Sequence, residues 1–282
     1  MSVHLWLRAE TKKNEQRAAL TPLVCKALLA HGFNVTIEHC SQRIFNDSEY
    51  ERMAGKMLNR FVRGSGLLLD LEFLEKKGRR VAAFGYHAGY AGAAVGLDIW
   101  CHQQLAPPSS PVPKQHPFAN ESELIKYLKS RLGKACKAAG KMPSIMVIGA
   151  LGRCGSGACD LARAPITPFL TKTMLQDPSR VLSVLTDVSC DATNPHNPIP
   201  VYYGASTFDD PVIKVEAGSV SLDVIAIDHL PTLLPREASE AFCNDLLPSL
   251  LDLMQPIRSS VWTGAAALFY KKSLSLSSHS KL

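Results

Sequence analysis

The sequence predicts an α/β protein with parallel strands, and three observations support this fold class. The first 40 residues follow a strand–helix–strand order, a short apolar run further along leads into a glycine-rich turn, and 46% of the 282 residues are hydrophobic. A strand–helix–strand unit joins two parallel strands, and a glycine turn after a strand is typical of phosphate-binding α/β folds. This length and hydrophobicity suffice for one large or two small cores.

The amino-terminal unit shows each expected signal in order. Residues 3–8 alternate between polar and apolar side chains, as in a strand. Thr21 and Pro22 predict a helix start, because a hydroxyl group can cap the first turn and proline fits its first position. Gly32 is expected to end this helix, and residues 33–38 alternate again. The unit therefore predicts a parallel pair of strands.

Two helices are predicted in the middle of the chain. Glycine and alanine recur between residues 85 and 96 at a spacing that lets a helix approach its neighbour closely, which explains these small residues without a ligand. Residues 105–118 are rich in proline and predict a surface connection. Residues 123–139 resume helical spacing, with Gly140 as the expected stop.

Residues 145–148 are apolar and predict a strand, and a turn rich in glycine follows them. Its glycines are Gly149, Gly152, Gly155 and Gly157, with Arg153 as a cation among them. Glycine lets backbone amides approach a pyrophosphate, and a helix predicted from Ser156 would offer its unpaired N–H groups to the same phosphates. The pattern predicts descent from a dinucleotide-binding protein, and a tight strand–helix corner without a ligand is the alternative.

The next part of a dinucleotide site is missing from the sequence. Such a site needs a second strand that ends in Asp or Glu about 20 residues later, to bind the ribose hydroxyls. Asp177 stands at this distance but lies in the polar turn 176–179. A further crossover takes about 30 residues, which do not fit before the next predicted strand at 181–188.

Charge and cysteine usage limit the classes of partner. Lys and Arg outnumber Asp and Glu by 31 to 25, and the thin spread of this excess predicts small anionic ligands rather than nucleic acid. Eight cysteines without a CxxC pair predict neither a metal site nor a disulfide framework. Charges at Arg8 and Glu10 argue against a signal peptide, and the apolar run 145–151 is shorter than the roughly 20 residues that span a bilayer.

The last three residues match a targeting signal. Ser280, Lys281 and Leu282 form the tripeptide that the peroxisomal import receptor binds, and the serine-rich residues 273–280 are expected to present it as a free tail. The expected location is therefore the peroxisome, the cytoplasm or both, with this receptor as a partner.

Seven blocks of the sequence carry a family resemblance. They are residues 8–12, 15–22, 78–84, 149–157, 187–191, 194–200 and 227–239. They are spread over nearly the whole chain and resemble saccharopine dehydrogenase, the NAD-dependent, lysine-forming enzyme of the aminoadipate route of lysine biosynthesis. The alanine dehydrogenase and transhydrogenase group shares residues 17–22 and is a related alternative, but the block at 227–239 is specific to saccharopine dehydrogenases among nicotinamide enzymes.

The resemblance implies two Rossmann-like α/β domains of the alanine dehydrogenase/transhydrogenase architecture, each truncated, with the active site in the cleft between them. Residues 1–84 and 238–282 would form the substrate-side domain, and residues 85–237 the NAD-binding domain. The implied reaction is the oxidation of saccharopine by hydride transfer to NAD, followed by hydrolysis of the imine to lysine and 2-oxoglutarate.

The resemblance also assigns site residues. Arg17 would bind a substrate carboxylate, and a bidentate guanidinium suits a substrate with three of them. The residues that would line the same cleft are Phe84, Ser189, Cys190 and Asp191. Those that would face NAD are Arg79, Arg80, Gly152, Arg153, Val188, Ile227, Asp228, His229 and Leu230. Val188 has the alternative of a plain strand residue, and His229 that of a buried loop histidine.

Two departures from the family pattern bear on activity. The chain passes from residues 51–55 almost directly to residues 59–64, which omits the segment that carries the catalytic lysine and histidine in the family. Lys56 and His87 lie outside the matching motifs, so no catalytic residue is assigned. A second gap near Ala164 removes the ribose-binding acid and its strand. We therefore expect a family member with impaired activity, and the alternative is a non-catalytic truncated form that keeps a carboxylate-binding surface.

Overall fold

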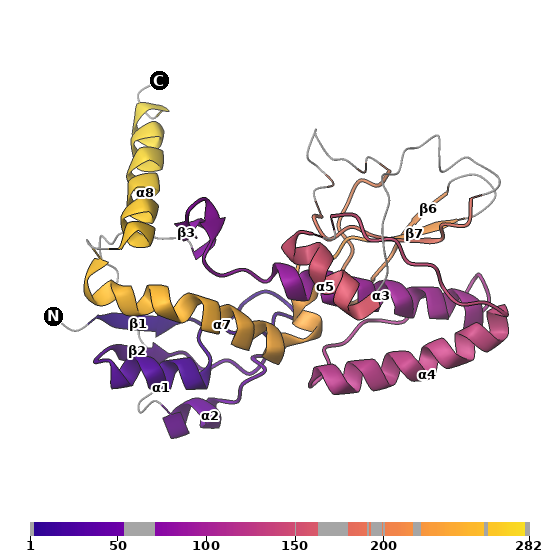
Figure 1. Cartoon of the computed structure of the whole chain (residues 1–282), viewed down its shortest axis with the longest axis horizontal. Coiled ribbons are helices and arrows are strands. Elements are labelled where there is room, and N and C mark those ends of the chain that lie inside the picture. The colour runs from indigo at the N-terminus through magenta and orange to yellow at the C-terminus, as the bar shows by residue number, and fades with distance from the viewer. Residues whose placement is uncertain are drawn as a thin grey trace. The chain divides into compact units, whose positions relative to one another are not determined.

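The chain forms two compact units, which Figure 1 shows in a computed structural model. One unit comprises Met1–Phe84 and Ala238–Leu282, and the other comprises Gly85–Glu237. The structure describes residues 3–53, 71–149, 151–162, 180–190, 192, 199, 201–216, 221–256 and 259–279. Several predictions concern residues outside this part of the chain: the gaps near Gly55 and Ala164, the acids Asp177 and Asp191, and the tripeptide 280–282.

The first unit begins with the predicted strand–helix–strand order. Strand β1 (His4–Leu7) pairs in parallel with β2 (Asn34–Ile37), and α1 (Pro22–Ala30) joins them. Thr21 Oγ1 accepts a hydrogen bond from Val24 N across 3.3 Å, and Gly32 after the helix has φ +85°. Both signals that the sequence offered for the helix ends are confirmed.

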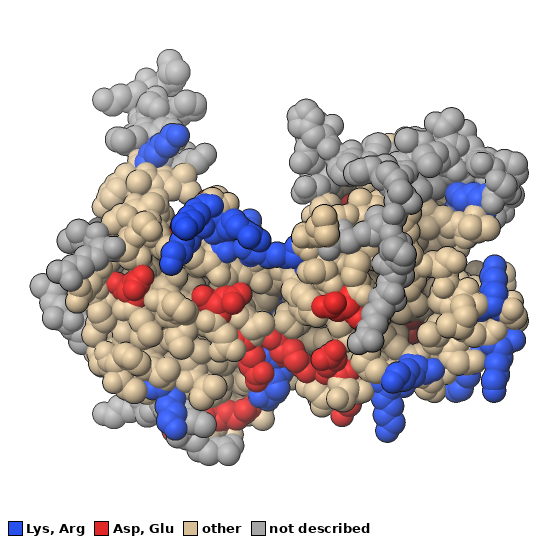
Figure 2. Space-filling view, in the orientation of Figure 1, with Lys and Arg blue, Asp and Glu red and all other residues tan. Residues whose placement is uncertain are grey.

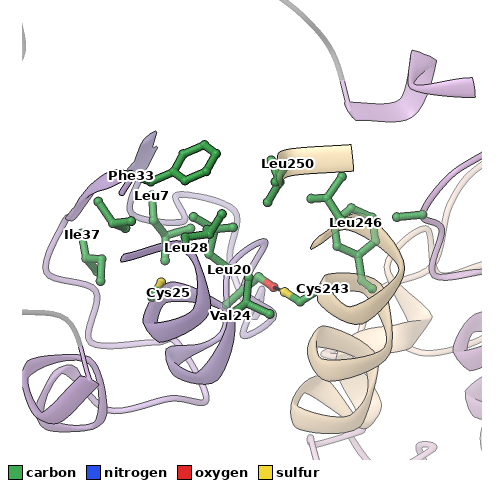
Figure 3. Close-up of a cluster of buried hydrophobic side chains, with 14 of the residues drawn as sticks. Leu7, Leu20, Val24, Cys25, Leu28, Phe33, Ile37, Cys243, Leu246 and Leu250 are labelled. Carbon is green, nitrogen blue, oxygen red and sulfur yellow. Dashed lines mark hydrogen bonds between the residues drawn. The ribbon is translucent and has the colours of Figure 1, made fainter. Parts of the chain in front are cut away.

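The core of this unit combines the amino-terminal strands with a helix from the other end of the chain. Helix α7 (Pro235–Leu251) contributes Phe242, Leu246 and Leu250 to one cluster with residues of β1, α1 and β2. Figure 3 shows Leu246 and Leu250 in this cluster. Complete burial of a leucine side chain stabilises the fold by about 1.5 to 3 kcal/mol. Packing between segments some 200 residues apart in sequence therefore holds this unit together.

The described part of the first unit also contains further elements. They are α2 (Asp47–Met53), η1 (Leu71–Phe73), the hairpin of β3 (Glu75–Lys76) and β4 (Arg79–Arg80), η3 (Asp252–Met254) and α8 (Ser260–His279). Because α8 continues to His279, the prediction of a free tail from residue 273 is wrong for most of that segment. Leucine alternates with serine there, and the described main chain satisfies its hydrogen bonds as a helix.

The described residues of the second unit include three α-helices and a small mixed sheet. The helices are α3 (Gly85–Leu105), α4 (Glu121–Ala139) and α5 (Arg153–Ala162), and a short η2 (Leu230–Leu233) follows the sheet. The sheet contains β5 (Val184–Thr186), β6 (Ile213–Val215) and β7 (Leu222–Ile225). Its order is β5-β7-β6, with β5 parallel and β6 antiparallel to β7. Asn120 caps α4 and Gly140 ends it in the left-handed conformation, as the sequence predicted.

The glycines of α3 allow very close helix packing. A Cβ atom on Gly89 would lie 1.7 Å from the carbonyl oxygen of Cys154 on α5, and one on Gly157 would lie 1.9 Å from that of Tyr86. Both distances are far below van der Waals contact, so only glycine fits at these positions. The packing explanation for the small residues of α3 is therefore confirmed, and Gly157 of the glycine-rich block serves the same contact.

The strand predicted at residues 145–148 is absent, so this prediction is wrong. Residues 142–147 are irregular and lead into a turn at residues 148–149. Within the described parts of the chain, β5 pairs only with β7, and no strand covers its other edge. Met146 and Ile148 are 50% and 39% exposed, whereas a central strand needs backbone partners and burial. The short connection between α5 and β5 does not hold a complete crossover with a further neighbouring strand.

Candidate functional site

The loop between β1 and α1 carries Arg17 and is fixed on both sides of it. Ala18 N donates to Ser239 Oγ on α7 across 2.8 Å, and Ile44 N donates to Gln16 O across 2.9 Å. Cys243 Sγ, also on α7, lies 3.1 Å from Ala19 O. The main chain next to Arg17 is therefore held by α7 and by the segment after β2.

The guanidinium of Arg17 is paired with the carboxylate of Glu15. Nε donates to Glu15 Oε1 across 2.8 Å, and Nη2 donates to Oε2 across 2.5 Å. The main-chain N of Arg17 also donates to Oε1 across 3.0 Å. Burial and the neighbouring Glu15 raise the pKa of Glu10, while Arg17 and Arg43 act in the opposite direction. These groups form a charged cluster beside the loop.

Aromatic rings lie against the other side of Arg17. Its guanidinium carbon is 4.2 Å from the centre of the Phe84 ring, and Phe84 stacks on Phe242 of α7 with a centroid distance of 4.3 Å and an interplanar angle of 9°. A guanidinium over an aromatic face gains about 0.5 to 2 kcal/mol and loses freedom to turn. The structure therefore brings the predicted residues Arg17 and Phe84 into direct contact.

Arg79 and Arg80 lie on the exposed hairpin of β3 and β4. Lys76 of β3 lies opposite Arg79 of β4 in the antiparallel register. Lys77 and Gly78 form the turn of the hairpin and have positive φ angles. The side chain of Arg80 lies 3.4 Å from the carboxylate of Glu72. Figure 2 shows this basic patch on the surface of the first unit. Exposed cations of this kind attract anions without fixing their orientation.

In the second unit, the glycine turn stands directly before α5. Gly149 has φ +76°, which glycine adopts without strain, and Gly152 N donates to Gly149 O across 2.8 Å. Gly152 and Arg153 are both exposed at the start of the helix. A turn with free space around Gly149, followed by a helix N-terminus, is an arrangement that can bind a phosphate.

The residues after β5 form a turn around a buried carboxylate. Asp187 is 3% exposed and accepts hydrogen bonds from Ser189 N, Ser189 Oγ and Tyr202 Oη across 2.9, 2.6 and 2.6 Å. Cys190 adopts φ +52°, and its Sγ lies 3.4 Å from Asp187 O. Asp187 thus stabilises the turn that exposes Ser189.

The residues after β7 are mostly part of the core. Ile227 and Leu230 are each 1% exposed, so their side chains face the interior and only their main chain can reach a ligand. His229 Nδ1 lies 2.7 Å from Asp228 Oδ1, and its ring is 5.0 Å from that of Phe208. Its Nε2 is buried and has no hydrogen-bond partner among the described residues. Only one of the two ring nitrogens of His229 therefore has a hydrogen-bond partner among the described residues.

Parallel pairing brings two of the predicted groups to the same edge of the sheet. Val188 follows β5 and Leu230 follows β7, and a Cβ atom on Gly92 of α3 would lie 3.2 and 3.3 Å from their methyl groups. Both side chains thus pack against α3.

Two residues of the Arg17 site were not predicted from the sequence. They are Glu15, which pairs with Arg17, and Phe242, which stacks on Phe84. Glu15 stands in the same block two residues earlier, which was an available signal, whereas nothing local marks Phe242.

No group of three or more His, Cys, Asp or Glu side chains among the described residues is arranged to hold a metal ion. None of the helices in the part of the chain that the structure describes is long and apolar enough to cross a membrane.

The fold and these sites define an α/β protein of Rossmann-like character, with a parallel strand pair in each unit. Residues 6–60 match the family model "Alanine dehydrogenase/PNT, N-terminal domain". Similar solved structures include an L-alanine dehydrogenase (13% identity, TM-score 0.49, covering 91% of both chains) and a transhydrogenase from Sinorhizobium meliloti (12% identity, TM-score 0.46, covering 89% of this chain and 94% of the other).

Curated relatives give a closer match. The chain is 41% identical to a saccharopine dehydrogenase (NAD+, L-lysine-forming) from Yarrowia lipolytica, over 95% of this chain and 97% of the relative. It is 40% identical to the protein of the same name from Schizosaccharomyces pombe, over 94% and 97%. The chain belongs to the saccharopine dehydrogenase family. The first alignment spans 358 positions whereas the chain has 282 residues, so at least 76 positions of that alignment have no residue here. Internal segments of the relative are therefore missing.

Proposed function

We propose that this chain recognises saccharopine and 2-oxoglutarate through Arg17 and takes part in NAD-dependent cleavage of saccharopine to L-lysine and 2-oxoglutarate. The observation that carries the proposal is the guanidinium of Arg17, held between Glu15 and the stacked rings of Phe84 and Phe242. A fixed, partly desolvated guanidinium is suited to bind a carboxylate. Family membership supplies the identity of the substrate.

NAD would accept the hydride in this reaction. Its pyrophosphate fits the turn from Gly149 to Gly152 and the start of α5, where Arg153 adds a cation. Its ribose fits less well, because residues 163–183 between α5 and β5 are fewer than the roughly 30 that a further crossover with a strand ending in an acid would take. We therefore propose retained but weak dinucleotide binding by the second unit, with the main chain at 188 and 227–230 as the remaining contacts.

We further propose that turnover is slow. The family lysine and histidine belong to a segment that the chain lacks, and proton transfer by positioned groups is worth about 10² to 10⁴ in rate. A guanidinium does not serve as a base in proteins, so the arginines assigned above do not replace these two residues. The chain then keeps ligand recognition without the groups that move protons.

Calorimetric titration of the full chain tests the recognition step. 2-Oxoglutarate and saccharopine should bind at least about tenfold more tightly than pyruvate or L-alanine, because the second carboxylate adds a charge-assisted hydrogen bond. Equal affinity for all four compounds would contradict recognition of a second carboxylate, and no binding of any would overturn the proposal.

Ser280, Lys281 and Leu282 support a separate proposal, delivery to peroxisomes by the import receptor for this tripeptide. A fluorescent protein fused in front of the chain should collect in peroxisomes, and the same fusion without the tripeptide should stay diffuse. A diffuse signal from both fusions would contradict delivery.

A further inference from the structure

We propose that Glu15 is a positioning residue, which holds one side of the Arg17 guanidinium so that the carboxylate of the ligand binds to its other end. The inference rests on the proposed function, because it takes Arg17 as the partner of a ligand carboxylate. It concerns Glu15 alone and assigns no proton transfer to it.

The contacts of Arg17 leave a defined set of donors. A guanidinium has five N–H groups, one on Nε and two on each Nη atom. Glu15 accepts from Nε and from Nη2, which are the two donors on the side of the group. Among the described residues no hydrogen bond is formed by Nη1. The end of the group, made of Nη1 and the second N–H of Nη2, is therefore the edge that a bidentate carboxylate can use.

Three features make this orientation specific. The Glu15 side chain is only 9% exposed, and that of Arg17 is 17% exposed, so the pair is largely shielded from water. The ring of Phe84 covers one face of the guanidinium. The main chain on both sides of Arg17 is held by Ser239 and Ile44. A free arginine side chain loses rotamer entropy when a ligand orders it, and a ligand that meets an already ordered guanidinium does not incur this loss.

Glu15 could also act as a competitor that occupies the site of the ligand carboxylate. Its negative charge does weaken the attraction between Arg17 and an anion. The two hydrogen bonds nevertheless lie on the Nε side of the group, and the end remains available. The two roles predict opposite signs: removing a positioning residue weakens ligand binding, and removing a competitor strengthens it.

The experiment compares 2-oxoglutarate affinity, measured by calorimetry on the full chain, for the wild type, Glu15→Gln, Glu15→Asp, Arg17→Lys and the Glu15→Gln, Arg17→Lys double variant. Asp209→Asn is the matched control, because Asp209 pairs with Lys114 across 3.3 Å at an exposed position of the other unit. Glu15→Gln should weaken binding about tenfold, and Glu15→Asp, which keeps the carboxylate, should recover to within about threefold of wild type. The control should stay within about twofold.

The double variant shows whether Glu15 acts through Arg17. If it does, Glu15→Gln adds less than about twofold to the loss caused by Arg17→Lys, because the two residues work as a unit. Equal or tighter binding by Glu15→Gln overturns the inference and leaves the proposed function intact. An unchanged affinity in Arg17→Lys, or no binding by the wild type, overturns the proposed role of Arg17 and the inference with it. Thermal unfolding of each variant verifies that it is folded.

Discussion

The carboxylate of Asp98 on α3 lies 2.5 Å from Nε of Arg131 on α4, and this ion pair joins the two helices. Tyr127 Oη and Gln115 Nε2 donate to the same carboxylate across 3.1 and 3.2 Å. Asp98 is 3% exposed, whereas the side chain of Arg131 is 24% exposed. Loss of the arginine would leave a buried charge without its counterion.

The first prediction concerns this pair. Arg131→Met should lower the free energy of unfolding by about 2 kcal/mol, less than the roughly 3 to 5 kcal/mol of a fully buried pair because water partly screens Arg131. Lys129→Met, at an exposed position of the same helix, is the control and should change stability by less than about 0.5 kcal/mol. Urea unfolding, monitored by circular dichroism, gives the free energy of unfolding of each variant. Equal stabilities of the two variants would contradict the prediction.

The second prediction concerns the close packing of α3 and α5. Gly157→Ala should destabilise the chain by about 2 kcal/mol or more, because the new methyl group would overlap the carbonyl oxygen of Tyr86. Gly133→Ala, inside α4 with open space around it, should instead be neutral or stabilising by up to about 1 kcal/mol, since alanine favours the helix. A similar effect of both substitutions on the urea midpoint would show that space at Gly157 is not limiting.

The third prediction is a pH dependence of stability from His87. Burial lowers the pKa of His87 below its ordinary value of 6.5, although Glu237 and Glu121 act in the opposite direction. The unfolded chain then binds this proton more readily than the folded one, so the stability that the neutral form contributes is lost as the pH falls below about 6.5.

His87→Gln should therefore lose less stability than the wild type between about pH 7.5 and pH 5.5. His116→Gln, at an exposed position, serves as the control and should follow the wild type. Urea unfolding at the two pH values gives the difference directly. A pH dependence in His87→Gln as steep as that of the wild type would rule out this histidine as its source.

The fourth prediction is weak NAD binding. The turn at Gly149 to Gly152 can hold the pyrophosphate, but each hydrogen bond lost to a buried polar ligand costs about 1 to 3 kcal/mol. Calorimetry should give a dissociation constant of about 1 mM or higher, and a chain with the missing segments restored from the Yarrowia lipolytica relative should bind far more tightly. A micromolar complex with the present chain would show that another acid binds the ribose, and Asp177→Asn would then test that residue.

The fifth prediction is slow turnover. With saturating saccharopine and NAD, the rate of NADH formation should be lower than that of the restored chain by about 10² to 10⁴ for each missing proton-transfer group. Both proteins are assayed side by side by NADH absorbance. Equal rates would overturn our interpretation of the first gap, because the present chain would then contain its own acid and base groups.

Local sequence signals determined the elements whose hydrogen bonds and caps lie within a few residues. Thr21 and Gly32 bound α1, and Gly140 ends α4, because capping and left-handed turns depend on the residue itself and its immediate neighbours. The small residues of α3 were also predicted from their spacing, although the α5 residues that they contact lie far along the chain. Arg17 and Phe84 were assigned from sequence blocks, and the structure places them in contact.

Strand pairing and side-chain contacts between segments far apart in the sequence were decided by the tertiary structure. Residues 145–148 have the composition of a strand but form none, since a strand exists only beside another strand and no described segment pairs with them. Phe242 stacks on Phe84 only because α7 returns to the first unit. Which edge of Arg17 remains open to a ligand depends on the carboxylate of Glu15, and only the folded geometry of the loop shows which donors that carboxylate occupies.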